Sequence, residues 1–583
     1  MSIVVRGRGL RRVLPGRGLV AVFCWGWLAV VAPLQAAGLP SLVDERHPAQ
    51  PASAPESREE RQRESGARVT LPDASDADRR AREVPVAHIR FHGGTVFELD
   101  DLARELRPMV GRRVTVGELA DAVERITRRY QEAGYPLSFA YLPADNFQDG
   151  IVTVVLVEGF VAQTELEIAR EPVRRRVDRL AEQVVGERPL TRATFERYTA
   201  LMGRIPGAEL SVNAPVPRTP GGATTLRVEE QRTRWVTPGL TIEGDDVDDF
   251  RLLASLAFQS TTRYADQLAL AALLPVDDDE AFYAAEYSQE LGADGWRVSV
   301  AASRYDTEDA DDLFSDGDGA VRESRVADRY RIGLEYPLVL SARLLWAAGI
   351  EVGHHREQSQ VDYDGQLELD RHLHFSAAGL DTRLMTGRDG RIVELRADVR
   401  RGVDLGDNRN DWRLVSTEGE AWFEQPEELE FLRFGLGARW VQPLGATWRF
   451  SARADGFWSG DALPSPERGN YGGTARFGRG YSDNQAQGDY GAAGEVELRY
   501  VHGLQTRWLR SLEPYVVVDG ARTRYQEREV EHELASAALG LELARGRAYR
   551  LRVEYARPVA DRDAGSGQRD GRVNVRLAWD LSG

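Results

Sequence analysis

The chain has 583 residues, which exceeds the size of one ordinary domain, and its net charge is −17 at pH 7. This acidic balance argues against binding to a nucleic-acid backbone. The single cysteine, Cys24, lies in an apolar N-terminal segment, so we expect neither disulfides nor cysteine-ligated metals in the mature protein.

Residues 1–37 are predicted to be an export signal. Five arginines between positions 6 and 17 precede the apolar run 19–33, and Ala36 and Ala37 offer a small-residue cleavage site. This run is shorter than the about 18 apolar residues of a membrane-spanning helix. No later segment is long and apolar enough either, so a membrane-embedded mature chain would have to form a β-barrel.

Residues 38–83 are predicted to be a disordered linker, because they are rich in Pro, Ala and charged residues. A short plug helix at residues 57–65 stays open, since its apolar face is poor. Order is expected to begin near residue 84.

Residues 84–160 are predicted to form a small β-α-α-β-β module. The second helix should begin at the capping box Thr115-x-x-Glu118. Apolar residues follow that box at helical spacing. The expected elements are a strand at 86–91, helices at 97–107 and 116–133, and strands at 137–142 and 151–157.

Residues 161–232 repeat this pattern. The expected elements are a strand at 162–168, helices at 173–185 and 191–205, and strands at 209–213 and 223–228. Small sheets with an exposed edge capture extended partners by strand addition. A purely structural role is the alternative, and the pattern by itself leaves both open.

Residues 233–583 lack helical periodicity and alternate apolar with polar side chains in segments of about ten residues. Residues 549–555 place Tyr, Leu and Val on one face and Arg and Glu on the other. Aromatic residues recur at segment ends, as at Tyr500, Tyr549, Tyr555 and Trp579. A charged face on segment after segment favours a transmembrane barrel with a wet lumen over a soluble β-protein.

The connections predict the strand number. Short turns are expected at 292–295 and 387–390, and long acidic loops at 306–326 and 357–371, as in barrels with short periplasmic turns and long external loops. Of sixteen or seventeen candidate strands, an even number keeps both barrel ends in the periplasm, so residues 412–426 are assigned to a loop. The predicted fold is α+β modules followed by an all-β, 16-stranded antiparallel outer-membrane barrel.

Residues 463–492 stand out within this region as a Gly-rich loop, with Arg479 between Gly478 and Gly480. It is not a phosphate-binding loop, because neither a helix nor a lysine follows it. An alternating strand follows instead.

The order of these features resembles the outer-membrane transporters of two-partner secretion, which export haemolysins and filamentous adhesins. Their superfamily also contains the barrel-assembly insertases. The modules look like POTRA domains, and residues 134–159 are similar to the end of the first one. Two further stretches carry the resemblance: the family's sixth loop, with Glu467, Gly472, Gly473, Arg479, Gly480, Tyr481, Gly488 and Asp489, and its thirteenth-strand signature, at residues 514–519.

The resemblance implies that the loop enters the lumen and that Arg479 meets Asp519 on the inner wall. Two positions depart from the family pattern: Gly478 stands where Val is usual, and residues 517–521 read VVDGA in place of Phe-x-Asp-x-Gly. If Arg479 and Asp519 form a simple ion pair, reversing either charge alone should abolish secretion, and exchanging the two charges should restore it. The alternative is an exposed arginine without a specific bond.

Two metal signals are weak, and we predict no metal site. Asp311, Asp312, Asp316 and Asp318 lack the ligand spacing of a Ca²⁺ loop. His372 and His374 share a strand face without an evident third ligand. No set of nucleophile, base and orienting residue is evident either, so we predict no enzyme activity and no cofactor.

The resemblance implies an outer-membrane pore whose N-terminal domains lie in the periplasm. Its POTRA domains would bind a secreted exoprotein, such as a β-helical adhesin, cytolysin or toxin, which would cross unfolded to the cell surface. No nucleic-acid partner is expected. The alternatives are a barrel-assembly insertase of the same superfamily and a passive porin or adhesin.

Overall fold

The computed structural model describes residues 80–143, 147–244, 250–274, 280–311, 321–363, 367–416, 419–424, 427–473, 477–546, 548–563 and 567–581. The predicted signal, the plug helix at 57–65 and the acidic positions Asp312, Asp316 and Asp318 lie outside the described residues. Within the part of the chain that is described, no helix has the length and apolar character needed to cross a membrane.

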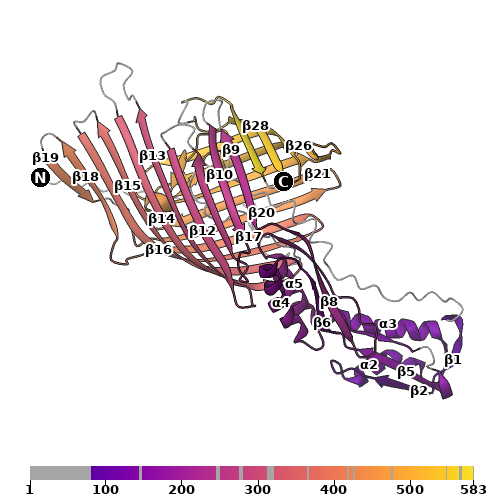
Figure 1. Cartoon of the computed structure of the whole chain (residues 1–583). Coiled ribbons are helices and arrows are strands. Elements are labelled where there is room, and N and C mark those ends of the chain that lie inside the picture. The colour runs from indigo at the N-terminus through magenta and orange to yellow at the C-terminus, as the bar shows by residue number, and fades with distance from the viewer. Residues whose placement is uncertain are drawn as a thin grey trace, which may run out of the picture. The chain divides into compact units, whose positions relative to one another are not determined.

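The first module packs two helices against a three-stranded sheet (Figure 1). The helices are α2 (Leu99–Leu106) and α3 (Val116–Glu132), and the sheet runs β2 (His88–His92), β5 (Ile151–Val157), β4 (Phe139–Tyr141). The capping box predicted at Thr115 and Glu118 is present. Further short elements are β1 (Glu83–Pro85), β3 (Arg113–Thr115), η3 (Arg107–Met109) and η4 (Gln148–Gly150).

The second module repeats this arrangement. Its helices are α4 (Glu171–Val185) and α5 (Arg192–Gly203), and its sheet runs β6 (Phe160–Glu167), β8 (Ala223–Thr233), β7 (Ala208–Asn213). In both modules the last strand in sequence is the central one and pairs in parallel with the first. The two remaining strands therefore form the edges of each sheet.

Sixteen antiparallel strands form a closed barrel, as predicted (Figure 1). The ring closes because β29 pairs with both β28 and β9. In order around the wall, the strands are β9 (Val236–Gly244), β10 (Phe250–Gln259), β11 (Gln267–Leu274), β12 (Glu280–Leu291), β13 (Trp296–Asp311), β14 (Val321–Leu340), β15 (Leu344–Tyr363), β16 (Leu367–Arg388), β17 (Arg391–Val403), β20 (Leu432–Leu444), β21 (Trp448–Ser459), β24 (Tyr490–Tyr500), β26 (Ser511–Arg524), β27 (Glu531–Ala544), β28 (Tyr549–Pro558) and β29 (Arg572–Asp580).

A hairpin of β18 (Arg409–Ser416) and β19 (Gly419–Glu424) stands outside this ring. It pairs with the first part of β16, from Leu367 to His374, whereas β17 pairs directly with β20. Residues 412–426 therefore belong to a connection, as predicted, although the connection itself is a β-hairpin. A short strand, β25 (His502–Gly503), likewise lies in the turn between β24 and β26.

The prediction of a long loop at 357–371 is wrong. β15 and β16 have 20 and 22 residues and stay paired from Leu344↔Thr386 to Tyr363↔Leu367. The loop expected at 306–326 is also shorter than predicted, since β13 ends at Asp311 and β14 begins at Val321. Polar and charged residues occupy both faces of this segment, including the buried positions His355, Glu357 and Ser359, so the apolar–polar alternation disappears while backbone pairing continues.

The two faces of the barrel wall differ in chemistry. On β26, Tyr515, Val517 and Asp519 are buried toward the lumen, whereas Val516 and Val518 are exposed. Exposed tryptophans gather where strands meet the short turns or the last strand ends: Trp296, Trp346, Trp440, Trp448 and Trp579. This aromatic belt marks one interface of an outer-membrane barrel.

Candidate functional site in the barrel lumen

The segment between β21 and β24 folds into the lumen. It contains a short helix, η5 (Ser465–Glu467), and a hairpin of β22 (Gly469–Tyr471) and β23 (Ala486–Gly488). Its side chains and backbone contact β10, β17, β20, β26, β27 and β29. Only a segment inside the ring touches strands so far apart around the wall.

Arg479 lies at the tip of this loop among three carboxylates. Its side chain is 5% exposed. Nη2 donates to Oε2 of Glu495 at 2.6 Å, and Nη1 donates to Oε2 of Glu554 at 2.9 Å. Nε lies 3.4 Å from Oδ2 of Asp519 without donating a hydrogen bond. One cation therefore joins β24, β26 and β28.

Asp519 mainly holds the backbone of the loop. Its carboxylate accepts the N–H of Gly478 at 2.9 Å and of Arg479 at 3.4 Å. It also accepts the hydroxyl of Ser536 at 2.6 Å. The structure thus places Arg479 beside Asp519, but the hydrogen bonds of the guanidinium go to Glu495 and Glu554.

Sequence reasoning missed three residues of this cluster, Glu495, Glu554 and Asn574, and it placed Tyr515 in the strand signature without giving it a contact to the loop. The Tyr515 hydroxyl donates to Oε2 of Glu554 at 2.7 Å, and Nδ2 of Asn574 donates to the carbonyl of Arg479 at 3.2 Å. All four lie on lumen-facing strand positions. The alternation in the sequence identifies that face, but not which of its polar residues meets the loop.

Gly480 and Tyr481 fit the loop tip to β27 and β28. Tyr481 is fully buried, and its hydroxyl donates to the carbonyl of Ala535 at 3.0 Å and accepts the N–H of Ala560 at 3.2 Å. A Cβ at Gly480 would lie 2.7 Å from the backbone nitrogen of Pro558. A side chain at position 480 would therefore push the tip off the wall.

Gly478, where the family pattern has Val, adopts a left-handed conformation with φ +98°. A Cβ there would lie 2.8 Å from Cδ1 of Leu534. A β-branched residue is strained at such a φ. Gly472 and Gly473 have φ values of +121° and +86°, so the same turn depends on glycine at three positions.

The base of the loop is held by two acidic residues. Glu467 lies 3.2 Å from Nη2 of Arg400 and 3.9 Å from Nη1 of Arg433, on β17 and β20. Asp489 accepts the N–H groups of Leu463 at 2.9 Å and Gln526 at 2.8 Å. Both carboxylates tie the loop to the wall where it enters and leaves.

Gly488 is set against the neighbouring strand. A Cβ there would lie 2.5 Å from the carbonyl oxygen of Arg524. Glu467, Gly488 and Asp489 are thus the residues singled out from the sequence that lie at the base of the loop.

The model of the haemolysin secretion/activation proteins ShlB/FhaC/HecB matches residues 222–543. The chain belongs to this family. A second model, the POTRA domain of ShlB type, matches residues 84–159. The family comprises transporters of two-partner secretion. Its members lie in the outer membrane with POTRA domains in the periplasm, and the same holds for this chain.

Individual relatives are distant. The heme/hemopexin transporter protein HuxB of Haemophilus influenzae strain 86-028NP is 22% identical over 174 residues, which are 29% of this chain and 31% of that protein. The match thus spans about a third of that relative.

Two solved structures share the fold. CdiB from Escherichia coli has a TM-score of 0.64 at 16% identity, covering 91% of this chain and all of that one. CdiB from Acinetobacter baumannii has a TM-score of 0.59 at 13% identity, covering 90% of this chain and 96% of that one.

A second charged cluster lies on the lumenal face of the barrel wall, beside the Arg479 cluster. Arg499 donates to Glu497 at 2.8 Å and to Glu542 at 2.9 Å, and its guanidinium lies 4.6 Å from the ring centre of Tyr515. Because Tyr515 also donates to Glu554, the two clusters form one connected polar network.

The POTRA domain at residues 84–159 contains a partly buried carboxylate with neutral hydrogen-bond donors. Glu158 accepts the N–H groups of Thr95 and Val96 at 2.6 and 2.8 Å and the Tyr130 hydroxyl at 3.1 Å. Burial raises the pKa of the Glu158 carboxyl, but these hydrogen bonds outweigh burial and hold the pKa below its ordinary value. Burial and the Glu158 charge raise the pKa of the Tyr130 hydroxyl.

His372 and His374 lie on β16, whereas most aspartates of the Ca²⁺ signal lie outside the described residues. His372 Nδ1 lies 3.9 Å from Oδ2 of Asp411, and among the described residues no third ligand joins His372 and His374. Across the described ranges, no group of three His, Cys, Asp or Glu side chains is arranged to hold a metal.

Proposed function

We propose that this chain exports a partner exoprotein across the outer membrane. The POTRA modules capture the partner in the periplasm, and the partner passes through the barrel lumen as an extended chain. Because the periplasm holds no ATP, folding of the partner outside the cell supplies the driving force. The proposal includes no enzymatic step.

The observation that carries the proposal is the lumenal loop with its ionic tip. A polypeptide crossing this barrel must displace the loop, and Arg479 is held by hydrogen bonds to carboxylates. Such bonds contribute little net free energy when water or peptide groups replace them, about 0.5–3 kcal/mol each. The tip is therefore suited to leave its site and return.

The edges of the two modules support the capture step. In the first module β2 and β4 flank β5, and in the second β6 and β7 flank β8. Backbone N–H and C=O groups on an edge strand pair with an added strand whatever its side chains. Capture of an unfolded partner needs this tolerance of sequence.

Export is tested by deleting the gene and analysing the culture supernatant by proteomics. We expect the loss of one large secreted protein and its return when the gene is restored. An unchanged supernatant combined with depleted outer-membrane barrels would instead indicate the insertase function and overturn export.

Capture is tested by placing a photo-crosslinking residue at Arg90, on the edge strand β2. The matched control is Arg128, on the exposed face of α3. We expect cross-links to the secreted protein from position 90 and few from position 128. Equal yields at both positions would contradict capture at this edge.

A further inference from the structure

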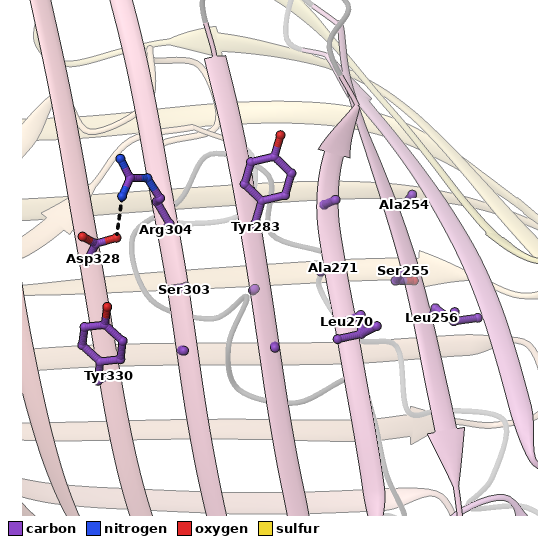
Figure 2. Close-up of a pocket in the computed structure, with 14 residues that line it drawn as sticks. Ala254, Ser255, Leu256, Leu270, Ala271, Tyr283, Ser303, Arg304, Asp328 and Tyr330 are labelled. Atoms are coloured by element: carbon purple, nitrogen blue, oxygen red, sulfur yellow. Dashed lines mark ion pairs between the residues drawn. The ribbon is translucent and has the colours of Figure 1, made fainter.

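A groove of about 700 Å³ crosses β10 to β14 on the barrel wall. Figure 2 shows the residues that line it, with Tyr283, Arg304 and Tyr330 on neighbouring strands. Its volume lies within the range of small-molecule sites, about 300–1,000 Å³. It is separate from the lumenal loop.

The groove opens toward lipid. Arg251 of β10 pairs with Glu280 of β12 and with Asp483 of the lumenal loop, so Arg251 and Glu280 face the lumen. Tyr283 is three residues beyond Glu280 and therefore points to the opposite face. Tyr283 and Tyr330 are accordingly 59% and 53% exposed.

The floor of the groove consists of small side chains on the outward face. Two adjoining cross-strand rows supply them: Ala254↔Ala272↔Tyr283 and Leu270↔Ala285↔Ala302↔Tyr330. The next row toward the periplasm carries large residues instead: Leu268↔Tyr287↔Val300↔Ile332. The alanines thus form a hollow bounded by Leu and Tyr side chains.

A guanidinium stands at the outer end of this hollow. Arg304 shares the outward face of β13 with Trp296 and lies eight positions farther along the strand. At about 3.3 Å per residue and a strand tilt of about 40°, Arg304 lies about 20 Å above the tryptophan belt. The apolar band of such barrels is about 25 Å tall, so Arg304 is near the level of the outer-leaflet headgroups.

Arg304 forms two long ion pairs at this level, at 3.6 Å to Asp328 (Figure 2) and at 3.8 Å to Asp306. Its side chain is 54% exposed, and at these distances it donates a hydrogen bond to neither carboxylate, so its N–H groups remain available to a further acceptor. Arg356 stands opposite Asp328 in register and is also exposed. Two exposed guanidiniums therefore stand on either side of Asp328, and a phosphate group here would contact these guanidiniums rather than the carboxylate between them.

Lipid tails are as apolar as leucine, so the groove gains no hydrophobic free energy from a tail that leaves the bilayer. Selectivity must come from shape and from the headgroup. We propose that the groove holds one acyl chain of a phosphate-bearing lipid of the outer leaflet, with its phosphate against Arg304 and Arg356. Planar guanidinium groups bind phosphate through paired hydrogen bonds.

The proposal is tested by native mass spectrometry of the full-length protein, using lipid A and dephosphorylated lipid A as probes. Ala302→Phe fills the floor, and its matched control is Ala537→Phe, at an exposed outward alanine of β27 between Val518 and Leu539. Arg304→Gln removes the charge without changing the floor. Its control is Arg343→Gln, in an exposed periplasmic turn.

Wild-type protein and both controls are expected to retain lipid A. Ala302→Phe and Arg304→Gln are expected to retain about tenfold less, which corresponds to about 1.4 kcal/mol. Wild-type protein should retain the dephosphorylated probe as poorly as Arg304→Gln retains lipid A. Heat-modifiable gel migration checks that each barrel is folded.

Equal retention by wild type and Arg304→Gln would overturn the proposal. A disulfide-linked dimer formed through Tyr283→Cys in native membranes would also overturn it, because a second copy would then cover the groove.

Discussion

The lumenal cluster around Arg479 and the site around Glu158 both hold carboxylates, but the first buries them beside a cation, whereas the second leaves its carboxylate partly exposed and held by neutral donors. In the lumen, one cation faces Asp519, Glu495 and Glu554, on strands separated by up to 75 residues from the loop. In the first module, Glu158 accepts hydrogen bonds from two backbone N–H groups and from the hydroxyls of Thr95 and Tyr130.

This difference indicates which of the two sites, the Arg479 cluster or the Glu158 site, is suited to movement. Neutral donors fixed by the fold hold Glu158 in one position, so the site stabilises its domain. Arg479 arrives on a loop, and its departure leaves three carboxylates that attract it back. We therefore expect the lumenal cluster to control export and Glu158 to control stability. The predictions below test this contrast, from the largest expected effect to the smallest.

Arg479→Ala should have the largest effect. Uncompensated buried charge costs about 3–5 kcal/mol, so the loop tip should undock. Because the three carboxylates then have no cation to attract back, the tip should not return to its site and export should be lost. Export is measured as the partner in the supernatant. Undocking is measured by labelling a cysteine introduced by Ser482→Cys, since Cys24 is the chain's single cysteine. Arg343→Ala is the control, and a docked loop in Arg479→Ala would contradict this role.

Exchanging the charges, Arg479→Asp with Asp519→Arg, should not restore export. An arginine at 519 cannot accept the N–H of Gly478 or the hydroxyl of Ser536. An aspartate at 479 would face Glu495 and Glu554. Export is compared between the double variant and both single variants. Recovery in the double variant would restore the simple pair hypothesis.

Gly478→Val should weaken docking by about 1–3 kcal/mol, because position 478 has φ +98°. The added side chain also meets Leu534. Faster labelling at position 482 measures the change. Gly221→Val is the control, at a glycine without a positive φ and with open space around its Cβ position. Unchanged labelling would show that the turn adapts to the side chain.

Glu158→Gln should destabilise the first module by about 1 kcal/mol, because the site is partly exposed to solvent, and leave the barrel folded. Because the folded pKa of Glu158 lies below its ordinary value, its stabilisation is present above the unfolded pKa, about 4.3. It is lost as the pH falls through the lower folded value. Limited proteolysis of the module against pH measures this loss, which the Gln variant should lack.

Tyr515→Phe should have the smallest effect. It removes one hydrogen bond to Glu554, worth about 1 kcal/mol, and keeps the ring beside Arg499. Labelling at position 482 should rise slightly, with export nearly unchanged. Loss of export as complete as in Arg479→Ala would show that Tyr515 carries more of the network.

Much of the architecture was predictable from local pattern. The helices of both modules and the lumenal face of β26 follow from periods of 3.6 and 2 residues. The capping box at Thr115 follows from the motif Thr115-x-x-Glu118. The long strands β15 and β16 were not predictable, because polar and charged residues occupy both faces of their outer parts and the apolar–polar alternation disappears there. The pair β1 and β3 was missed because it has only three residues in each strand.

By itself the sequence determined the order of modules and barrel and the even strand number, and it singled out residues 463–492 as an unusual Gly-rich loop. Only the tertiary structure decided that Arg479 donates to Glu495 and Glu554 and that Asp519 holds the loop backbone. The reason is physical: alternation specifies which face a side chain occupies. Closure of the ring and the register of its strands then bring the lumenal loop, β24, β26 and β28 to one point.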